Sequence, residues 1–149
     1  MSAEVIPLNK IRTGLNAADW KDAIRLAGEI LLNAGSITDK YIESMINAVI
    51  DLGPYMVIMP GFALAHAAPG EANGNIKNDF SLINLVQPVN FINDQNPVSV
   101  VLCMSNIDHD SHLQNMRRVA MVISEDGVVD KLAAAKTDQE VYEIMNADM

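Results

Sequence analysis

Apolar residues recur at helical spacing in the first third of the chain. Behind residues 16–19, which have the composition of a helix start, they fall three or four positions apart as far as Gly35. A second stripe begins at Ser36 or Thr38 and ends at Gly53-Pro54. The stripes consist of Trp20, Ala23, Ile24, Ala27 and Ile30, and of Tyr41, Ile42, Met45, Ile46 and Val49. We therefore expect two amphipathic helices, each with one buried face.

The pattern then changes to short apolar runs. Residues 56–59 and 62–65, separated by Pro60-Gly61, predict a strand, a turn and a strand. Two more strands are expected at 80–86 and 89–92, on either side of Gln87-Pro88. Residues 98–104 are apolar almost throughout, which is typical of a strand buried on both faces. A polar, glycine-rich loop fills residues 67–78.

Helical patterns return after the last strand. The Ser111-x-x-Gln114 spacing predicts a helix with Ser111 as its N-cap, and a short helix is expected at 128–135. A final helix opens with the capping box Thr137-x-x-Glu140. The alternation of helices and strands, without a repeat or a linker, predicts a single α/β domain over residues 1–149. Its mixed sheet should carry helices on both faces.

Composition narrows the classes of function. The 149 residues carry a net charge of −9, which disfavours nucleic acid and anionic membranes as partners. The apolar runs are too short to span a bilayer, and residues 1–15 lack a signal-peptide core, so we expect no membrane insertion. The single cysteine fits a reducing compartment, which favours the cytoplasm. The acidic surface could recruit a basic protein, or it could serve only solubility.

Two histidines stand where α/β sheets place ligands. His66 follows the strand at 62–65 and opens the glycine-rich loop, whose backbone can approach a ligand closely. His112 follows the strand at 98–104 and falls in the first turn of the next helix, where N–H groups lack partners and the helix dipole is positive. Because sites in such sheets gather beyond the carboxyl ends of strands, both are candidate site residues.

Imidazole chemistry indicates what this pair could do. A neutral ring nitrogen can attack phosphorus near pH 7, because the ordinary histidine pKa is about 6.5. The other ring nitrogen should donate to a fixed acceptor, and the phosphoryl oxygens need donors. We therefore hypothesise that His66 accepts and passes on a phosphoryl group. His112, with the N–H groups of its helix start, would stabilise the phosphoryl oxygens. The pattern leaves open which nitrogen of His66 reacts and whether His112 is protonated.

Other reactive side chains fit structural roles better. His109 and His112 lie three positions apart beside two aspartates, but a zinc site usually needs three or four ligands and only His66 could add another. We therefore expect no metal, and nothing in the sequence indicates a cofactor. His109 is expected in a solvated loop. Cys103, inside a buried strand, is predicted to be a core residue, as are the methionines of the stripes and strands.

Three stretches of the chain carry a family resemblance. Residues 53–69 read Gly-Pro-Tyr-Met-Val-Ile-Met-Pro-Gly-Phe-Ala-Leu-Ala-His-Ala-Ala-Pro, and the other two are Asp108-x-x-Ser111-His112-Leu113 and Thr-Asp-Gln-Glu-Val at 137–141. They resemble the phosphorylation site, the second histidine motif and the closing helix of the mannitol/fructose-type enzyme IIA domains of the bacterial phosphoenolpyruvate-dependent sugar phosphotransferase system. The ascorbate-type branch, in which Gly-Pro-Tyr and Pro-Gly precede the site, is the most similar.

The resemblance implies donor, acceptor and fold. His66 would take a phosphoryl group from the phosphorylated carrier protein HPr and pass it to a cysteine of a IIB protein. A membrane IIC protein would use that group during sugar uptake, and His112 would contact the phosphoryl group. The implied fold, a mixed sheet between helices, agrees with the pattern.

The sequence departs from the family pattern at two places. Ala65 replaces the proline that usually precedes the phosphorylated histidine and restrains the backbone. Residues 48–51 read Ala-Val-Ile-Asp and lack the arginine of the mannitol and fructose members, which favours the ascorbate-type branch. Two alternatives remain open: a regulatory phosphoprotein of the same fold, and a non-catalytic module that binds an anion near His112.

Overall fold

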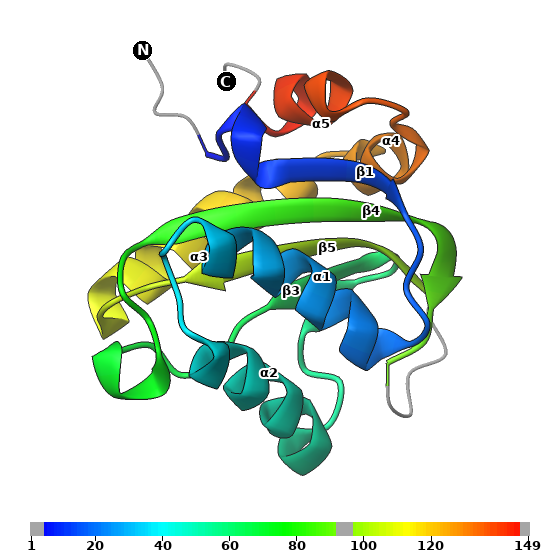
Figure 1. Ribbon diagram of the computed structural model, residues 1–149. Coiled ribbons are helices and arrows are strands. Elements are labelled where there is room, and N and C mark those ends of the chain that lie inside the picture. The colour runs from blue at the N-terminus through cyan, green and yellow to red at the C-terminus, as the bar shows by residue number, and fades with distance from the viewer. Residues whose placement is uncertain (1–4, 92–96, 147–149) are drawn as a thin grey trace.

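A five-stranded mixed sheet forms the centre of the computed structural model, which describes residues 5–91 and 97–146 (Figure 1). The strand order is β1-β4-β5-β3-β2. β1 pairs with β4 and β3 with β5 in parallel, whereas β4 pairs with β5 and β2 with β3 antiparallel. The strands are β1 (Ile11–Leu15), β2 (Val57–Met59), β3 (Phe62–Ala65), β4 (Asp79–Val89) and β5 (Val98–Ser105).

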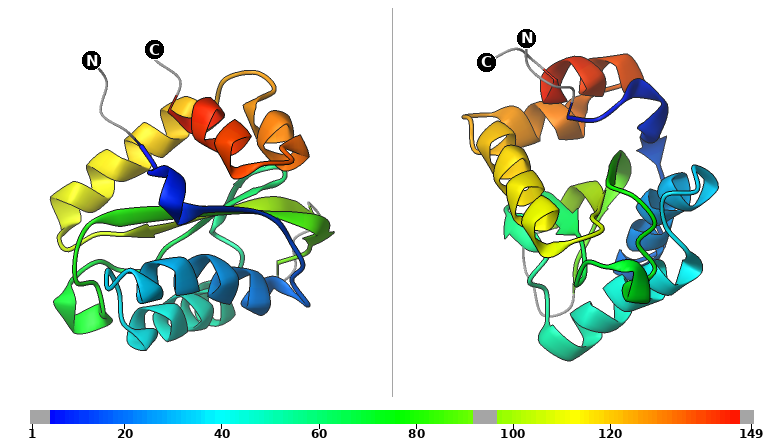
Figure 2. Two further views of the ribbon diagram at one scale, coloured as in Figure 1. Left: turned by 45° about the horizontal axis from the view of Figure 1, so that its top comes forward. Right: turned by 90° about the vertical axis from the view of Figure 1, so that its left-hand side faces the viewer.

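Helices cover both faces of this sheet, as the sequence predicts (Figures 1 and 2). Two helices lie on one face and pack on strand residues such as Ala65 and Cys103, and three lie on the other and pack on residues such as Leu64 and Leu102. The first pair is α1 (Trp20–Asn33) and α2 (Asp39–Leu52); the others are α3 (His109–Ile123), α4 (Val128–Ala134) and α5 (Asp138–Met145). Short 3-10 turns are η1 (Leu8–Lys10) and η2 (Glu71–Asn73).

The helix ends follow local side-chain chemistry. Asp19 caps α1 by accepting from the Asp22 N–H group, and α2 begins directly after Thr38, which decides between the two predicted starts. Gly53, with φ at +86°, follows the last residue of α2. The predicted capping box of α5 is present, because the Thr137 hydroxyl accepts from the Glu140 N–H group at 3.1 Å.

The two strands predicted on either side of Gln87-Pro88 were wrong, and one strand was not predicted at all. The run before Gln87-Pro88 does not end there, because β4 continues through this dipeptide to Val89. Pro88 has no N–H group to give to a ladder, and the pairing with β5 shifts register between Asn84 and Val89 instead of stopping. The second predicted strand is absent, because Val89 is the last residue of β4 and residues 90 and 91 belong to no strand; residue 92 lies outside the described residues. β1 was missed, since its five residues include Gly14 and present too short an alternation.

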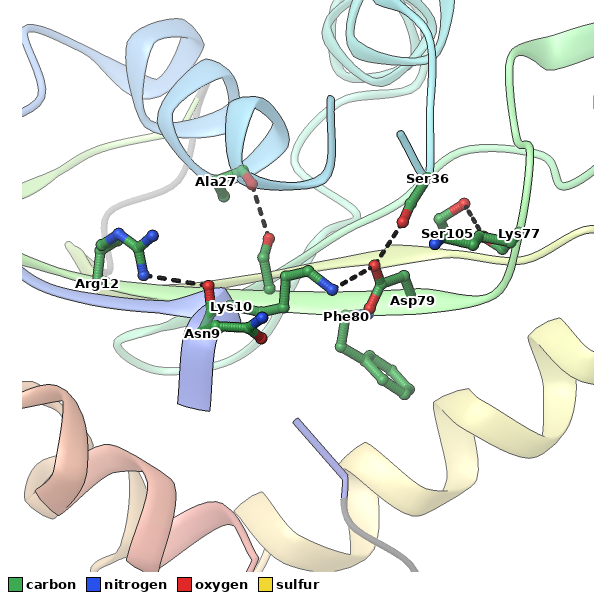
Figure 3. Close-up of polar contacts among 10 residues, drawn as sticks. Asn9, Lys10, Arg12, Ala27, Ser36, Lys77, Asp79, Phe80 and Ser105 are labelled. Atoms are coloured by element: carbon green, nitrogen blue, oxygen red, sulfur yellow. Dashed lines mark hydrogen bonds and ion pairs between the residues drawn. The ribbon is translucent and has the colours of Figure 1, made fainter. Parts of the chain in front are cut away.

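Polar contacts around Asp79 fix the start of β4 (Figure 3). Its carboxylate forms an ion pair with Lys10 at 2.9 Å and accepts from the Ser36 hydroxyl at 2.5 Å and the Phe80 N–H group at 2.9 Å. Both charged side chains are largely buried, so they are matched by partners rather than by water. The cluster connects η1, the turn before α2 and the end of the loop that carries the site.

The first and last described segments are tied together by one side chain. The Oδ1 atom of Asn146 accepts from the Val5 and Ile6 N–H groups at 2.5 and 3.0 Å, and its Nδ2 atom donates to the Ile6 carbonyl at 2.9 Å. These segments lie side by side near α5 (Figure 1). No helix within residues 5–91 and 97–146 is long and apolar enough to cross a membrane.

Candidate functional site

His66 lies immediately beyond β3, where the backbone leaves the sheet. Ala65, the last residue of the strand, is in register with Cys103 of β5. The residue is only 8% exposed, yet it lines a cleft of about 560 Å³. His66 is therefore largely shielded from solvent and still borders a cleft that a ligand could enter.

The tautomer of His66 follows from one contact. Its Nδ1 atom lies 2.6 Å from the carbonyl oxygen of Leu64. A carbonyl oxygen can only accept, so Nδ1 carries the proton and donates it. In the neutral ring the lone pair then resides on Nε2. The contact thus leaves Nε2 as the ring nitrogen that is free to bind or react in this tautomer.

His112 projects from the first turn of α3 toward the same place. Its ring centroid lies 5.5 Å from that of His66, and the two planes are tilted by 53°. The side chain is partly buried and also lines the cleft. The two histidines, 46 positions apart in the sequence, are therefore neighbours.

The predicted cap of this helix was wrong. Asp108, not Ser111, is the N-cap, and its Oδ1 atom accepts from the Ser111 N–H group at 2.7 Å and hydroxyl at 2.6 Å. An aspartate three positions before Ser111 is an equally good cap and also pairs with the positive end of the helix dipole. The His112 N–H group donates to the Asp108 carbonyl at 3.2 Å. These two N–H groups are thus not available to an anion, contrary to the sequence hypothesis. His109 is exposed as expected, but it is the first residue of α3 rather than a loop residue.

The cleft is bounded by the end of α2, by the segment around His66 and by His112. Asp51 is the one lining residue with a formal charge, and within the described residues neither lysine nor arginine lines this cleft. This agrees with the missing arginine in residues 48–51. The lining residues are Ser44, Asn47, Ala48, Asp51, Leu52, Tyr55, His66, Ala67, Ala68, Asn73 and His112.

Both rings favour the neutral form. Burial lowers the pKa of His66, His112 lowers it further by charge repulsion, and the bond to the Leu64 carbonyl opposes both effects. Burial also lowers the pKa of His112, with a smaller contribution from His109. A neutral His66 retains the Nε2 lone pair. A neutral His112 can offer one ring N–H group to a bound anion.

We searched the described residues for clusters of side chains that could bind a metal ion. In the part of the chain that the structure describes, no group of three or more His, Cys, Asp or Glu side chains is placed to hold an ion. Cys103 is fully buried, as predicted, and its Sγ atom lies 3.8 Å from the sulfur of Met45. The site therefore consists of two imidazoles, nearby polar groups and the backbone.

Comparison with known proteins identifies the family. The sequence model described as "Phosphoenolpyruvate-dependent sugar phosphotransferase system, EIIA 2" matches residues 4–148. The chain belongs to this family. It is 31% identical over 144 residues to the "Ascorbate-specific PTS system EIIA component" of Shigella dysenteriae serotype 1, covering 95% of this chain and 92% of that protein.

Solved structures agree with the family assignment. The mannitol-specific cryptic phosphotransferase enzyme IIA CmtB from Escherichia coli superposes with a TM-score of 0.89 at 27% identity, over 98% of this chain and 100% of that one. IIA mannitol in its complex with phosphorylated IIB mannitol, also from Escherichia coli, superposes with a TM-score of 0.84 at 20% identity. This match covers 96% of this chain and 98% of that one. The EIIA chain is thus a phosphotransferase that carries phosphoryl groups in the sugar phosphotransferase system.

Sequence reasoning about this EIIA chain missed the groups that hold His66. Tyr41 was assigned to a core stripe and Tyr55 only to a turn motif. The hydroxyl of Tyr55 donates to the His66 carbonyl, and that of Tyr41 accepts from the Ala67 N–H group at 3.1 Å. One signal was present, because a tyrosine in an otherwise apolar buried stripe needs a partner for its hydroxyl. The Leu64 carbonyl could not be found from side-chain patterns at all.

Proposed function

We propose that His66 is the residue that carries the phosphoryl group. The observation that supports this most directly is the contact between Nδ1 and the Leu64 carbonyl, because it leaves Nε2 as the free nucleophile of a cleft-lining ring. The Nε2 lone pair attacks the phosphorus of the donor, a bond between Nε2 and phosphorus forms, and the donor's own bond to phosphorus breaks.

The Leu64 carbonyl also favours the return step. It keeps the proton on Nδ1 in the phosphorylated ring, which then carries positive charge. When the group moves on, the bond between Nε2 and phosphorus breaks and the ring leaves as neutral imidazole. A neutral leaving group departs more easily than an imidazolate, so the same contact serves acceptance and release.

His112 is proposed to stabilise the phosphoryl oxygens. Its ring lies against that of His66 and lines the same cleft, where no lysine or arginine of the described residues is found. A ring N–H group donated to a phosphoryl oxygen offsets the charge that develops during transfer.

Family membership supports a proposal for the partners and the sugar. We propose phosphorylated HPr as donor, a cysteine of a IIB protein as acceptor and a membrane IIC protein as the site of uptake. The relatives named ascorbate-specific, together with the absence of arginine at residues 48–51, support ascorbate as the sugar. The cytoplasm is the compartment in which such a carrier would act.

Phosphate labelling tests the central claim. The chain is incubated with labelled phosphoenolpyruvate, enzyme I and HPr, and compared with His66→Ala and with His109→Ala as a matched control. We expect an acid-labile, alkali-stable label on the wild type and on His109→Ala and none on His66→Ala. A label that survives His66→Ala would overturn the assignment.

Further steps of the assay separate the alternatives. An unlabelled wild type would favour the anion-binding module. Labelling without onward transfer to a IIB cysteine would favour a regulatory role. Uptake of ascorbate by vesicles that contain IIB and IIC, only when this chain is added, would support the transport role and the sugar.

A further inference from the structure

The peptide bond between His66 and Ala67 is held at both of its polar atoms by tyrosine hydroxyls. Its carbonyl oxygen accepts from Tyr55, and its N–H group donates to Tyr41 at 3.1 Å. Tyr41 belongs to α2, and Tyr55 to the turn between α2 and β2. This peptide follows the first residue beyond β3, where the polar groups of a loop would ordinarily bond to water.

Tyr41 links that peptide to the sheet. Its hydroxyl donates to the Met104 carbonyl of β5 at 2.7 Å while it accepts from Ala67, and the residue is 1% exposed. Because the donor and acceptor capacities of the hydroxyl are both used, its position is set from two sides. The Ala67 N–H group is therefore held in a fixed relation to β5.

Tyr55 acts on the other side and also contacts the reactive ring. Its ring meets that of His66 edge to face, with centroids 5.1 Å apart and planes at 86°. Burial raises the pKa of Tyr55 to about 12, so the hydroxyl is a donor at neutral pH. One side chain thus restrains both the carbonyl and the imidazole of His66.

The tyrosine contacts restrain the backbone of His66 on its C-terminal side, whereas Ala65 does not restrain it on the N-terminal side. Upstream, β3 pairs with β5 as far as Ala65, and the ring is directed by the Leu64 carbonyl. Downstream, the orientation of the His66–Ala67 peptide sets the ψ angle of His66. A proline at position 65 would restrict the backbone before the histidine, and alanine does not. The tyrosines restrict it after the histidine.

We propose that Tyr55, supported by Tyr41, is a positioning residue for phosphoryl transfer, and that it supplies the backbone restraint which a proline at position 65 would otherwise give. The proposal rests on the proposed role of His66. It assigns Tyr55 no contact with the phosphoryl group, so its loss should slow the transfer step without weakening the encounter with the donor.

Tyr55→Phe in the full chain tests this, because it removes the hydroxyl and keeps the ring. The matched control is Tyr142→Phe, the same change on α5. Initial rates of phosphoryl transfer are measured over a range of phosphorylated HPr concentrations. We expect kcat to fall about tenfold or more in Tyr55→Phe, with KM within about twofold of wild type and Tyr142→Phe unchanged. Tyr41→Phe would leave the buried Met104 carbonyl and Ala67 N–H groups without their hydrogen-bond partner. It would therefore destabilise the fold, and it is used only to compare stability.

Hydrogen exchange at the Ala67 amide provides a second readout that does not need the donor. We expect this amide to exchange several-fold faster in Tyr55→Phe than in wild type, while amides within β4 keep their rates. A wild-type kcat in Tyr55→Phe, or a rise in KM alone, would overturn the proposal; the latter would make Tyr55 part of a docking surface. If the wild type accepts no phosphate label, the proposed function of His66 is wrong. The exchange measurement still tests the role of Tyr55, because equal Ala67 exchange rates in wild type and Tyr55→Phe would show that Tyr55 does not restrain this peptide.

Discussion

The imidazole of His112 lies 5.5 Å from that of His66, centroid to centroid, although His66 follows β3 and His112 lies in α3. Parallel pairing of β3 with β5 produces this relationship, because the segments that follow the two strands leave the sheet at the same edge. A phosphoryl group on Nε2 of His66 would stand beside a second ring that can donate to it.

His112→Ala is expected to lower the rate of phosphoryl transfer roughly 10²-fold, since it removes one donor to the transferring group. The residue is only partly buried, so the fold should persist. Stopped-flow or rapid-quench transfer from phosphorylated HPr measures the effect. His109→Ala, in the same helical turn but not on the cleft, is the control. Equal rates for the two variants would remove His112 from the mechanism.

The pH titration of His66 should be displaced downward. Burial, and secondarily His112, lower its pKa, so in the native protein the ring should take up a proton only below about pH 6.5, the ordinary value. An NMR titration of the ring Cε1–H resonance measures this, and the same resonance in urea gives the reference. A native midpoint at or above the urea midpoint would contradict the expectation.

The same displacement makes stability depend on pH. Above about pH 6.5 the ring is neutral in both states and contributes nothing to the difference. As the pH falls below that value, the unfolded chain takes up the proton before the native one does, so the native state loses stability. His112 is displaced in the same direction. Urea unfolding at pH 7.5 and 5.5 should show a smaller loss in His66→Gln than in wild type.

Gly74→Ala is expected to destabilise the loop that carries the site. Gly74 has φ at +97°, and an added Cβ would lie 2.6 Å from Thr38 Oγ1 and 2.7 Å from the Tyr41 nitrogen. Backbone strain and overpacking together should cost about 2–5 kcal/mol. Gly35→Ala is the matched control, because its φ is +77° but nothing lies within 4 Å, so strain alone should cost about 1–2 kcal/mol. Urea denaturation measures the free energy of unfolding of both variants. Equal losses of stability would show that the structure relieves the clash of the added Cβ with Thr38 and Tyr41.

Cys103 should be inert in the native protein. Burial raises the pKa of its thiol to about 12 and removes it from solvent, and thiolates rather than thiols react. Iodoacetamide at pH 8 is expected to modify the chain in urea and to leave the folded chain unmodified, as mass spectrometry would show. Rapid modification of the folded chain would mean that β5 opens readily.

Periodicity predicted the two-sided sheet because Ala65, Leu64 and their neighbours are uniformly apolar and must be covered on both faces. It failed at Pro88, where tertiary pairing carries a strand through a residue that usually interrupts one. It also failed at Ser111, because Asp108, three positions earlier and not considered as a cap, is the residue whose side chain caps the helix.

For the site, the sequence could identify reactive side chains but not their restraints. His66 and His112 became candidates because each follows an apolar strand, where α/β sheets place ligands, and because the motifs around them resemble those of a known family. The partners of the His66 peptide, Tyr41 and Tyr55, and the Leu64 carbonyl depend on how α2 and the turn after it fold back on β3. Such contacts join distant residues or involve backbone atoms, for which a sequence carries no pattern.

The Asn146 amide, which bonds to the backbone of Val5 and Ile6, has a consequence for how evolution or an engineer could use this fold. A fold whose first and last described segments are in contact can be inserted into an exposed loop of another protein with little change in the distance between the two ends of that loop. It can also be attached at either end while the cleft between α2 and α3 stays open to visiting proteins. This domain could therefore be fused to or inserted into other proteins while its cleft remains accessible.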